Sequence, residues 1–201
     1  MKKLLIAGLL ALGVSATAFA AKGDFNVYGR VGSGIHNSVS MDVTTVEADS
    51  ISFEVNLEGT REVTDNLEVG LGFGFHELAD VETKVDKTTM FQGKDYESHP
   101  IYVVAKYNFP VVGDGVKPYA VAHLGYALNG SMKAQYAGGK EYKENVDNGI
   151  YAGLGAGFEQ NNINVDAMFK TTQGEVEGKD CDQYRFVLSA GYRFNIPDFT
   201  K

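Results

Sequence analysis

The chain has 201 residues, among them 24 Gly, 4 Pro, one Cys and no Trp, and its formal net charge is −8. That length suits one ordinary domain, and an aromatic content of 11% excludes a generally disordered chain. A single cysteine excludes a disulfide framework and any metal site built from several cysteines, and the acidic balance argues against a nucleic-acid partner. We expect no cofactor and no bound nucleic acid.

Residues 1–20 predict a secretory signal peptide. Lys2 and Lys3 form a short basic region, and an apolar run of eleven residues follows from Leu4 to Val14. Ala18-Phe19-Ala20 then supplies the small residues of a cleavage site. The apolar run is too short for a transmembrane helix, which needs about 20 residues. We expect cleavage near Ala20 and a mature chain of residues 21–201.

From Phe25 onward apolar and polar residues alternate with a period of two, which predicts β-strands. In the clearest segment Ile51, Phe53, Val55 and Leu57 alternate with polar residues. The pattern predicts eight strands, at about 25–36, 50–60, 67–77, 99–109, 117–128, 148–159, 163–172 and 184–194. The fifth is ambiguous, and we favour Ala120, Ala122, Leu124, Tyr126 and Leu128 as its apolar face.

The connections alternate in length. Three are short, and four are long: Asn37–Asp49, Leu78–Glu97, Asn129–Asp147 and Gln173–Gln183, here called loops 1 to 4. Short turns at one end and long loops at the other predict an all-β fold, an eight-stranded antiparallel up-and-down barrel.

The apolar face of this barrel points outward, toward lipid, for three reasons. Glycines such as those of Gly70–Gly74 lie on the polar face, where they leave room in a narrow interior. The charges of that face balance, as buried charges must. They form our predicted interior network: Arg30, Glu54, Glu58, Glu68, Lys106, Glu159, Asp166, Lys170, Arg185 and Arg193.

The third reason is the position of the aromatic residues at both ends of the apolar face. Those at the short-turn end are Phe25, Tyr107, Phe109, Phe158, Tyr192 and Phe194. Those at the long-loop end are Phe53, Phe75, Tyr126, Phe169 and Tyr184. Two such girdles are typical of a transmembrane β-barrel. The alternative is a soluble periplasmic barrel, a lipocalin-like carrier with its apolar face inside.

The strands GLGFGF and IYAGLGAGF, the segment PYAVAHLGY and the closing FVLSAGYRF resemble the small eight-stranded outer-membrane barrels, the family of the OmpA transmembrane domain, OmpX and the opacity proteins. The resemblance implies residence in the cell outer membrane, in contact with lipid and lipopolysaccharide. It also implies insertion by the outer-membrane assembly machinery, which recognises a last strand that ends in an aromatic residue. Phe194 would be that residue, although the sequence continues to Lys201.

Eight strands enclose an interior that side chains fill, so a general diffusion porin is not expected. We expect a structural or surface-interaction barrel, adhesin-like, that reaches a host or cell-surface ligand through its loops. Candidate contact residues there are Phe91, Tyr96, Tyr136 and Tyr142. A narrow gated ion channel along the charged interior is the alternative.

We predict no enzymatic activity. His36-Asn37-Ser38 resembles the His-x-Ser pair of lipid A deacylases, which leaves a lipid-modifying enzyme as an alternative, but the alternation places His36 and Ser38 on the interior face. His76 and His99 should point to opposite faces, which speaks against a metal site, and His123 should belong to the interior network. Cys181 should be exposed and unpaired in loop 4.

Overall fold

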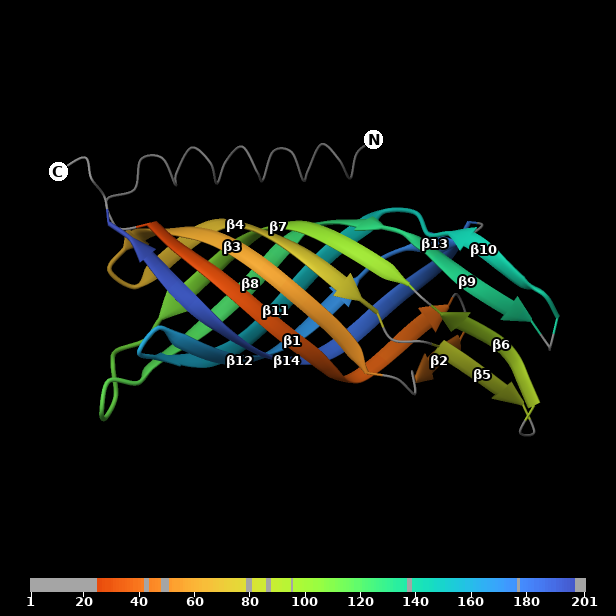
Figure 1. The fold of residues 1–201 in the computed structure, drawn as a ribbon, viewed down its shortest axis with the longest axis horizontal. Coiled ribbons are helices and arrows are strands. Elements are labelled where there is room, and N and C mark those ends of the chain that lie inside the picture. Colours follow the sequence, from red (N-terminus) through yellow and green to blue (C-terminus); the bar gives the residue numbers. More distant parts are fainter. Residues whose placement is uncertain are drawn as a thin grey trace.

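The computed structural model describes residues 25–41, 44–47, 51–78, 81–85, 88–94, 96–136, 139–176 and 178–197, so the predicted signal peptide lies outside the described residues. Eight long antiparallel strands follow one another around a barrel, which closes because the last strand pairs with the first (Figure 1). These strands are β1 (Phe25–Met41), β3 (Ser52–Thr64), β4 (Leu67–Glu77), β7 (Glu97–Asn108), β8 (Lys117–Asn129), β11 (Gly149–Gln160), β12 (Ile163–Thr172) and β14 (Lys179–Ile196). Within the described ranges no helix has the length and hydropathy needed to cross a membrane.

Short turns join the strands at one end of the barrel. Asn161 and Asn162 connect β11 to β12 with φ angles of 51° and 67°, the left-handed pair that a two-residue hairpin turn requires. Between β3 and β4, the Thr64 hydroxyl accepts a hydrogen bond from the Leu67 amide at 3.1 Å. These local interactions fix the register of the β3–β4 and β11–β12 hairpins.

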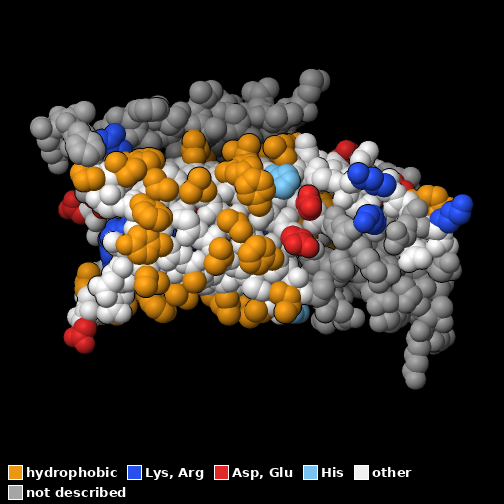
Figure 2. Space-filling view, in the orientation of Figure 1, with side chains coloured by type: hydrophobic (Ala, Val, Ile, Leu, Met, Phe, Trp, Pro, Cys, Tyr) orange, Lys and Arg blue, Asp and Glu red, His pale blue; other side chains and the backbone are white. Residues whose placement is uncertain are grey.

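The alternation of the sequence becomes an inward polar face and an outward apolar face. On the outside, Ile51, Leu57 and Leu154 are 76%, 60% and 68% exposed, and hydrophobic side chains cover the barrel wall in Figure 2. A soluble carrier with its apolar face inside is therefore excluded. In β8, His123 is buried while Leu124 is exposed, which confirms the face that we favoured for this strand.

The aromatic side chains of the two predicted girdles lie on this outer surface, none of them buried. Phe194 packs edge-on against Tyr192 at the short-turn end, with ring centroids 4.8 Å apart. Phe169 stacks on Tyr184 at the long-loop end, at 6.2 Å. An apolar wall between two aromatic girdles is the surface of a membrane-spanning barrel.

At the long-loop end the strands continue further than expected. β1 reaches Met41 and β14 begins at Lys179, so the two pair over almost their whole length and raise this side of the barrel beyond the aromatic girdle. The loops also contain short strands that the sequence analysis missed. They are β2 (Thr44–Glu47), β5 (Val81–Val85), β6 (Thr88–Lys94), β9 (Ser131–Tyr136), β10 (Glu141–Asn145) and β13 (Glu175–Val176).

One irregularity in β1 changes the face of two candidate residues. The register with β14 shifts between Gly34 and His36, where a β-bulge makes the neighbours Ile35 and His36 both exposed. After the bulge, Asn37 is buried and Ser38 is half-buried on the outer side. The predicted interior position of His36 and Ser38 is therefore wrong, because a bulge inserts one residue and inverts the alternation beyond it.

Loops 2 and 3 fold together. β5, β6, β9 and β10 form a separate four-stranded antiparallel sheet in the order β10-β9-β6-β5, which projects past the end of the barrel in Figure 1. The joint between the loops is the pairing of β6 with β9, where Phe91 lies opposite Tyr136.

Candidate functional site

The barrel interior holds the predicted charge network, and nine of its ten residues are buried. The exception is Arg193, whose side chain is 21% exposed near the short-turn end. The partners come from strands far apart in the chain, so the barrel must close before the charges can pair. We describe the network from the short-turn end to the long-loop end.

Glu68 anchors the layer nearest the short turns. Its carboxylate accepts hydrogen bonds from the Thr60 hydroxyl at 2.7 Å, the Asn108 amide at 2.8 Å and the Tyr28 hydroxyl at 2.9 Å. Lys106 Nζ lies 3.9 Å from the same carboxylate and 3.0 Å from that of Glu159. A second cation, Arg193, lies 3.1 Å from Glu159 and so completes this layer.

Arg30 occupies the middle layer between two carboxylates. Its Nε lies 3.3 Å from the carboxylate of Glu58, and its Nη1 donates a hydrogen bond to the carboxylate of Asp166. Asp166 also accepts hydrogen bonds from the hydroxyl groups of Tyr119, at 2.7 Å, and Ser189. This guanidinium is therefore neutralised by acids from two different strands, β3 and β12.

Glu54 is the centre of the layer toward the loops. Its carboxylate accepts a hydrogen bond from Lys170. The same carboxylate lies 3.4 Å from Arg185 Nη1 and 3.8 Å from a ring nitrogen of His76. His123 was expected in the network and lies there, 3.3 Å from the carboxylate of Glu58. His76 also belongs to it, with a contact of 3.0 Å to Arg185.

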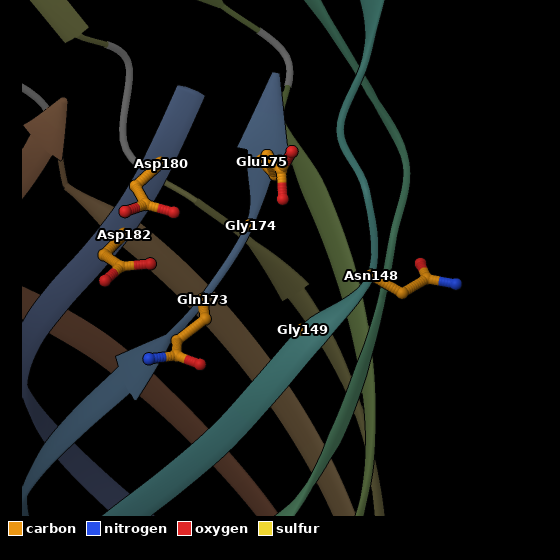
Figure 3. Close-up of a pocket in the computed structure, with 7 residues that line it drawn as sticks. All are labelled: Asn148, Gly149, Gln173, Gly174, Glu175, Asp180 and Asp182. Carbon is orange, nitrogen blue, oxygen red and sulfur yellow. The ribbon is translucent and has the colours of Figure 1, made fainter. Parts of the chain in front are cut away.

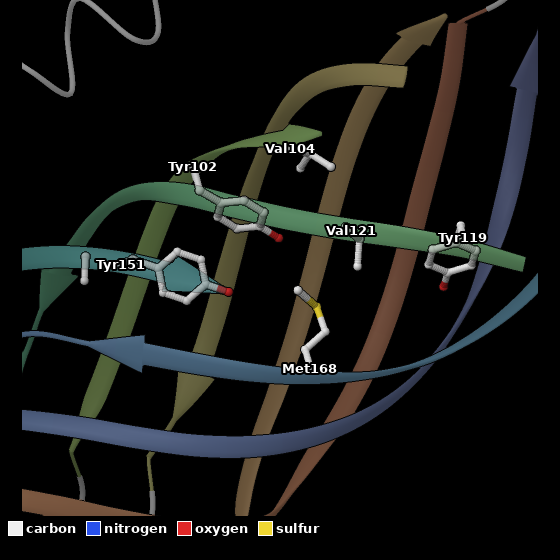
Figure 4. Packing of buried hydrophobic residues seen from close by; sticks show 7 residues of the cluster. Tyr102, Val104, Tyr119, Val121, Tyr151 and Met168 are labelled. Carbon is white, nitrogen blue, oxygen red and sulfur yellow. The ribbon is translucent and has the colours of Figure 1, made fainter. Parts of the chain in front are cut away.

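Tyrosines are the members of this interior that the sequence analysis did not single out. Figure 4 shows Tyr102, Tyr119 and Tyr151 projecting into the barrel beside Met168. The Tyr102 ring stacks on His123 with centroids 4.4 Å apart, and its hydroxyl donates to Glu58 at 3.1 Å. Their position on the polar face was the available signal, because a tyrosine there fills space and also donates a hydrogen bond.

Above the charges, on the loop side, two buried apolar clusters follow neutral polar residues such as Thr172 and Gln183. Leu78, Tyr96, Met132 and Val146 form one buried cluster, here called the apolar cap. Cys181 is buried beside Val39 in a neighbouring cluster, so its predicted exposure is wrong. Tyr96, expected to be a contact residue at the surface, is only 2% exposed. Cys181 lies in the part of β14 that extends beyond the predicted strand, and Tyr96 directly precedes β7. The alternation of these two strands turns both side chains inward.

Of the other loop candidates, Tyr142 in β10 is at the surface, with an exposure of 56%. For Phe91 and Tyr136 the structure defines the paired backbone positions. His76 and His99 lie on opposite faces as expected, with His99 outside against Phe75 at a ring distance of 5.2 Å. In the described part of the chain, no three His, Cys, Asp or Glu side chains are grouped to hold a metal ion.

One small pocket opens at the rim, between the start of β11 and loop 4 (Figure 3), with a volume of about 120 Å³. Its lining is polar and acidic: Asn148, Gly149, Gln173, Gly174, Glu175, Asp180 and Asp182. In Figure 3 Asn148 points away from the acidic side chains, and its amide oxygen accepts a hydrogen bond from the Asn129 backbone at 2.8 Å. We assign no ligand to this pocket.

Comparisons with known proteins agree with this architecture. The model of the family described as "Outer membrane protein beta-barrel domain" matches residues 6–194. Protein PM1543 of Pasteurella multocida (strain Pm70) is 29% identical over 238 aligned positions, which cover 96% of this chain and 98% of PM1543.

Solved structures show the same fold at low identity. Neisserial surface protein A is 17% identical with a TM-score of 0.51, and the match covers 86% of this chain and all of that one. Outer membrane protein AlkL is 12% identical with a TM-score of 0.50, and the match covers 90% of this chain and 94% of that one.

Proposed function

The chain belongs to the outer membrane protein β-barrel family and lies in the bacterial outer membrane, and from this premise we propose that it is an adhesin-like, surface-interaction barrel that acts through its long loops. The observation that carries the proposal is the four-stranded sheet of loops 2 and 3, an ordered structure that projects from the barrel end. An ordered projection can bind a partner without the entropy cost of ordering a flexible loop on contact.

The interior supports this proposal because it leaves little room for transport. Charged residues fill the middle of the barrel, and the apolar cap lies over them on the loop side. On the loop side of the charges lie buried neutral residues such as Thr172 and Gln183, and then Leu78, Met132 and Val146, whose side chains offer no polar group in place of an ion's hydration shell. We therefore propose a structural role for the ten-residue network: it holds the barrel closed in one register.

Surface display tests the proposed function. Bacteria that carry the full chain should attach to immobilised host-matrix material, and attachment should fall to background when residues 81–94 are replaced by a short Gly-Ser linker. The matched control replaces residues 111–115, at the short-turn end, with the same linker and should attach normally. Heat-dependent gel mobility verifies that each barrel is folded. Equal attachment by the two variants would overturn the proposal.

A lipid-modifying activity is the second candidate, and one observation favours it. The bulge in β1 turns His36 and Ser38 toward the outside, where they pair with Phe186 and Tyr184 at the level of the outer aromatic girdle. At that level the His36 imidazole, as a base, and the Ser38 hydroxyl could reach the acyl ester of a lipid. It ranks second because, among the described residues, no hydrogen bond joins His36 to Ser38. Mass spectrometry of lipid A from cells with the natural chain and with Ser38→Ala decides it, since equal spectra exclude the activity.

A further inference from the structure

The three short turns of the barrel differ in what they expose. Two of them have polar tips, Asp65-Asn66 and Asn161-Asn162. The third, residues 109–116 between β7 and β8, instead begins with a run of four exposed apolar residues, Phe109, Pro110, Val111 and Val112. Val111 and Val112 are 59% and 53% exposed. Such a run on a protein surface is unfavourable unless something covers it. We refer to residues 109–116 as the apolar turn.

Hydrogen bonds hold the apolar turn in this exposed conformation. Val112 and Val116 exchange two backbone hydrogen bonds, of 2.8 and 3.2 Å. Between them, Gly113 and Gly115 have φ angles of 52° and 89°, in the left-handed region that favours glycine. The Gln160 side chain, from the end of β11, donates a hydrogen bond to the Asp114 carbonyl at 3.0 Å. The valines are therefore presented at the surface by a tied hairpin.

The apolar turn starts at the edge of the lipid-facing surface. Phe109, its first residue, belongs to the aromatic girdle of the short-turn end and packs edge-on against Tyr107, with ring centroids 5.1 Å apart. The exposed run from Phe109 to Val112 therefore continues the lipid-facing surface without a polar residue in between. In Figure 1 the turn, drawn in green, bends away from the barrel axis, so that its tip lies to the side of the barrel and not over its opening.

We propose that the apolar turn is a membrane anchor, which inserts Val111 and Val112 among the phospholipid acyl chains of the periplasmic leaflet, beside the barrel wall. The short turns of such a barrel face the periplasm, and insertion removes the valines from water. The next charged residues in the chain, Asp114 and Lys117, follow the valines, so the tip stays among the headgroups. Lipid is favoured over a protein partner because the run continues a surface that lipid already covers. The inference concerns the opposite end of the barrel from loops 2 and 3 and does not rest on the proposed function.

The chain contains no tryptophan, so a single introduced tryptophan reports the surroundings of the turn. The experiment uses the mature chain, one copy per phospholipid nanodisc, with brominated acyl chains as the quencher in the membrane and iodide as the quencher in water. Val112→Trp should lose most of its fluorescence to brominated lipid and little to iodide. Asp65→Trp, in the polar β3–β4 turn at the same end, is the matched control and should show the reverse. Both probes carry the preference of tryptophan for a membrane interface, so a difference between them measures the position of the turn.

A second variant separates insertion driven by the valines from insertion driven by the probe. Val111→Asp, added to Val112→Trp, should increase quenching by iodide and decrease quenching by brominated lipid, because a carboxylate among acyl chains is costly. The gel mobility of unheated samples shows whether each variant is folded.

Three outcomes would overturn the inference. The first is equal quenching of Val112→Trp and Asp65→Trp, which would place both turns at the same depth. The second is quenching that Val111→Asp leaves unchanged. The third is shielding of Val112→Trp from both quenchers, because the turn would then pack against protein and not against lipid.

Discussion

Arg185 and Glu54 face each other inside the barrel with Nη1 3.4 Å from Oε2, although the whole of β1 separates their strands in the sheet. The carboxylate of Glu54 also accepts a hydrogen bond from Lys170 of β12, one strand further around. One acid therefore connects the first half of the barrel to the last two strands. Since lipid cannot satisfy an open sheet edge, this connection supports the closure on which the fold depends.

Glu54→Gln should destabilise the barrel strongly, because it leaves Lys170 and Arg185 buried without their counter-charge. Breaking a buried ion pair by removing one partner costs on the order of 3–5 kcal/mol. Urea titration in detergent, followed by the gel mobility of unheated samples, measures the effect. Asp65→Asn, in the exposed β3–β4 turn, should stay within about 0.5 kcal/mol of the natural chain. Equal midpoints for the two variants would contradict a structural role for the network.

Gly72 leaves space for Tyr102, whose hydroxyl bonds to Asn56 and Glu58. A Cβ atom at Gly72 would lie 2.5 Å from the Tyr102 ring carbon Cζ, so Gly72→Ala should displace the ring and its hydrogen bonds. We expect a loss of about 1–3 kcal/mol. Gly29→Ala is the control, because a Cβ there meets nothing within 4 Å. Urea midpoints that fall equally for both would show that strand propensity, not interior space, sets the requirement for glycine.

Cys181 lies on the loop side, beyond the outer girdle, and burial raises the pKa of its thiol from 9.0 to about 11. The thiolate is the reactive form, so maleimide should label the folded chain slowly at pH 8 and the urea-unfolded chain quickly. Lys179→Cys, exposed two residues earlier, should label quickly in the folded state. Because the thiol pKa is higher in the folded state, this group stabilises the fold below about pH 9, and that contribution is lost as the pH rises toward 11. Equal labelling rates at positions 179 and 181 in the folded chain would contradict the burial of the thiol.

The alternation of apolar and polar residues was sufficient to predict the barrel, its eight strands and its outward apolar face. In the membrane-spanning part this signal is strong because each strand contacts two very different media, lipid and a charged interior. In the loops a strand contacts neither lipid on one side nor the charged interior on the other. The alternation of apolar and polar residues there no longer shows which side is inside. The apolar cap shows this, since Tyr96 and Cys181 turn inward in a region that the sequence presented as exposed loop.

Two other features depend on relationships that no single segment contains. The bulge between Gly34 and His36 inserts one residue, which inverts the faces of every later position in β1. Glycine in a strand can signal a bulge, but Gly34 equally fits the glycines that occupy regular interior positions in the other strands. The four-stranded sheet of loops 2 and 3 forms only when β6 and β9 pair, and that pairing joins two loops separated by β7 and β8. A single sequence reveals the composition of each loop, but not that two loops pair in one register.

Phe194 is the proposed assembly signal, and its position allows a test that separates assembly from stability. It lies outside near the end of β14, opposite Val27, and is 55% exposed. Phe194→Ala should lower the amount of folded barrel in the outer membrane of growing cells several-fold, while purified protein should refold in detergent with the yield of the natural chain. Phe158→Ala is the control, because that side chain is 50% exposed in the same girdle but belongs to β11. If both variants accumulate equally in cells, Phe194 is only one of several aromatic residues of the girdle and has no separate role in assembly. If Phe194→Ala also fails to refold in detergent, its role is in the fold itself and not in recognition by the assembly machinery.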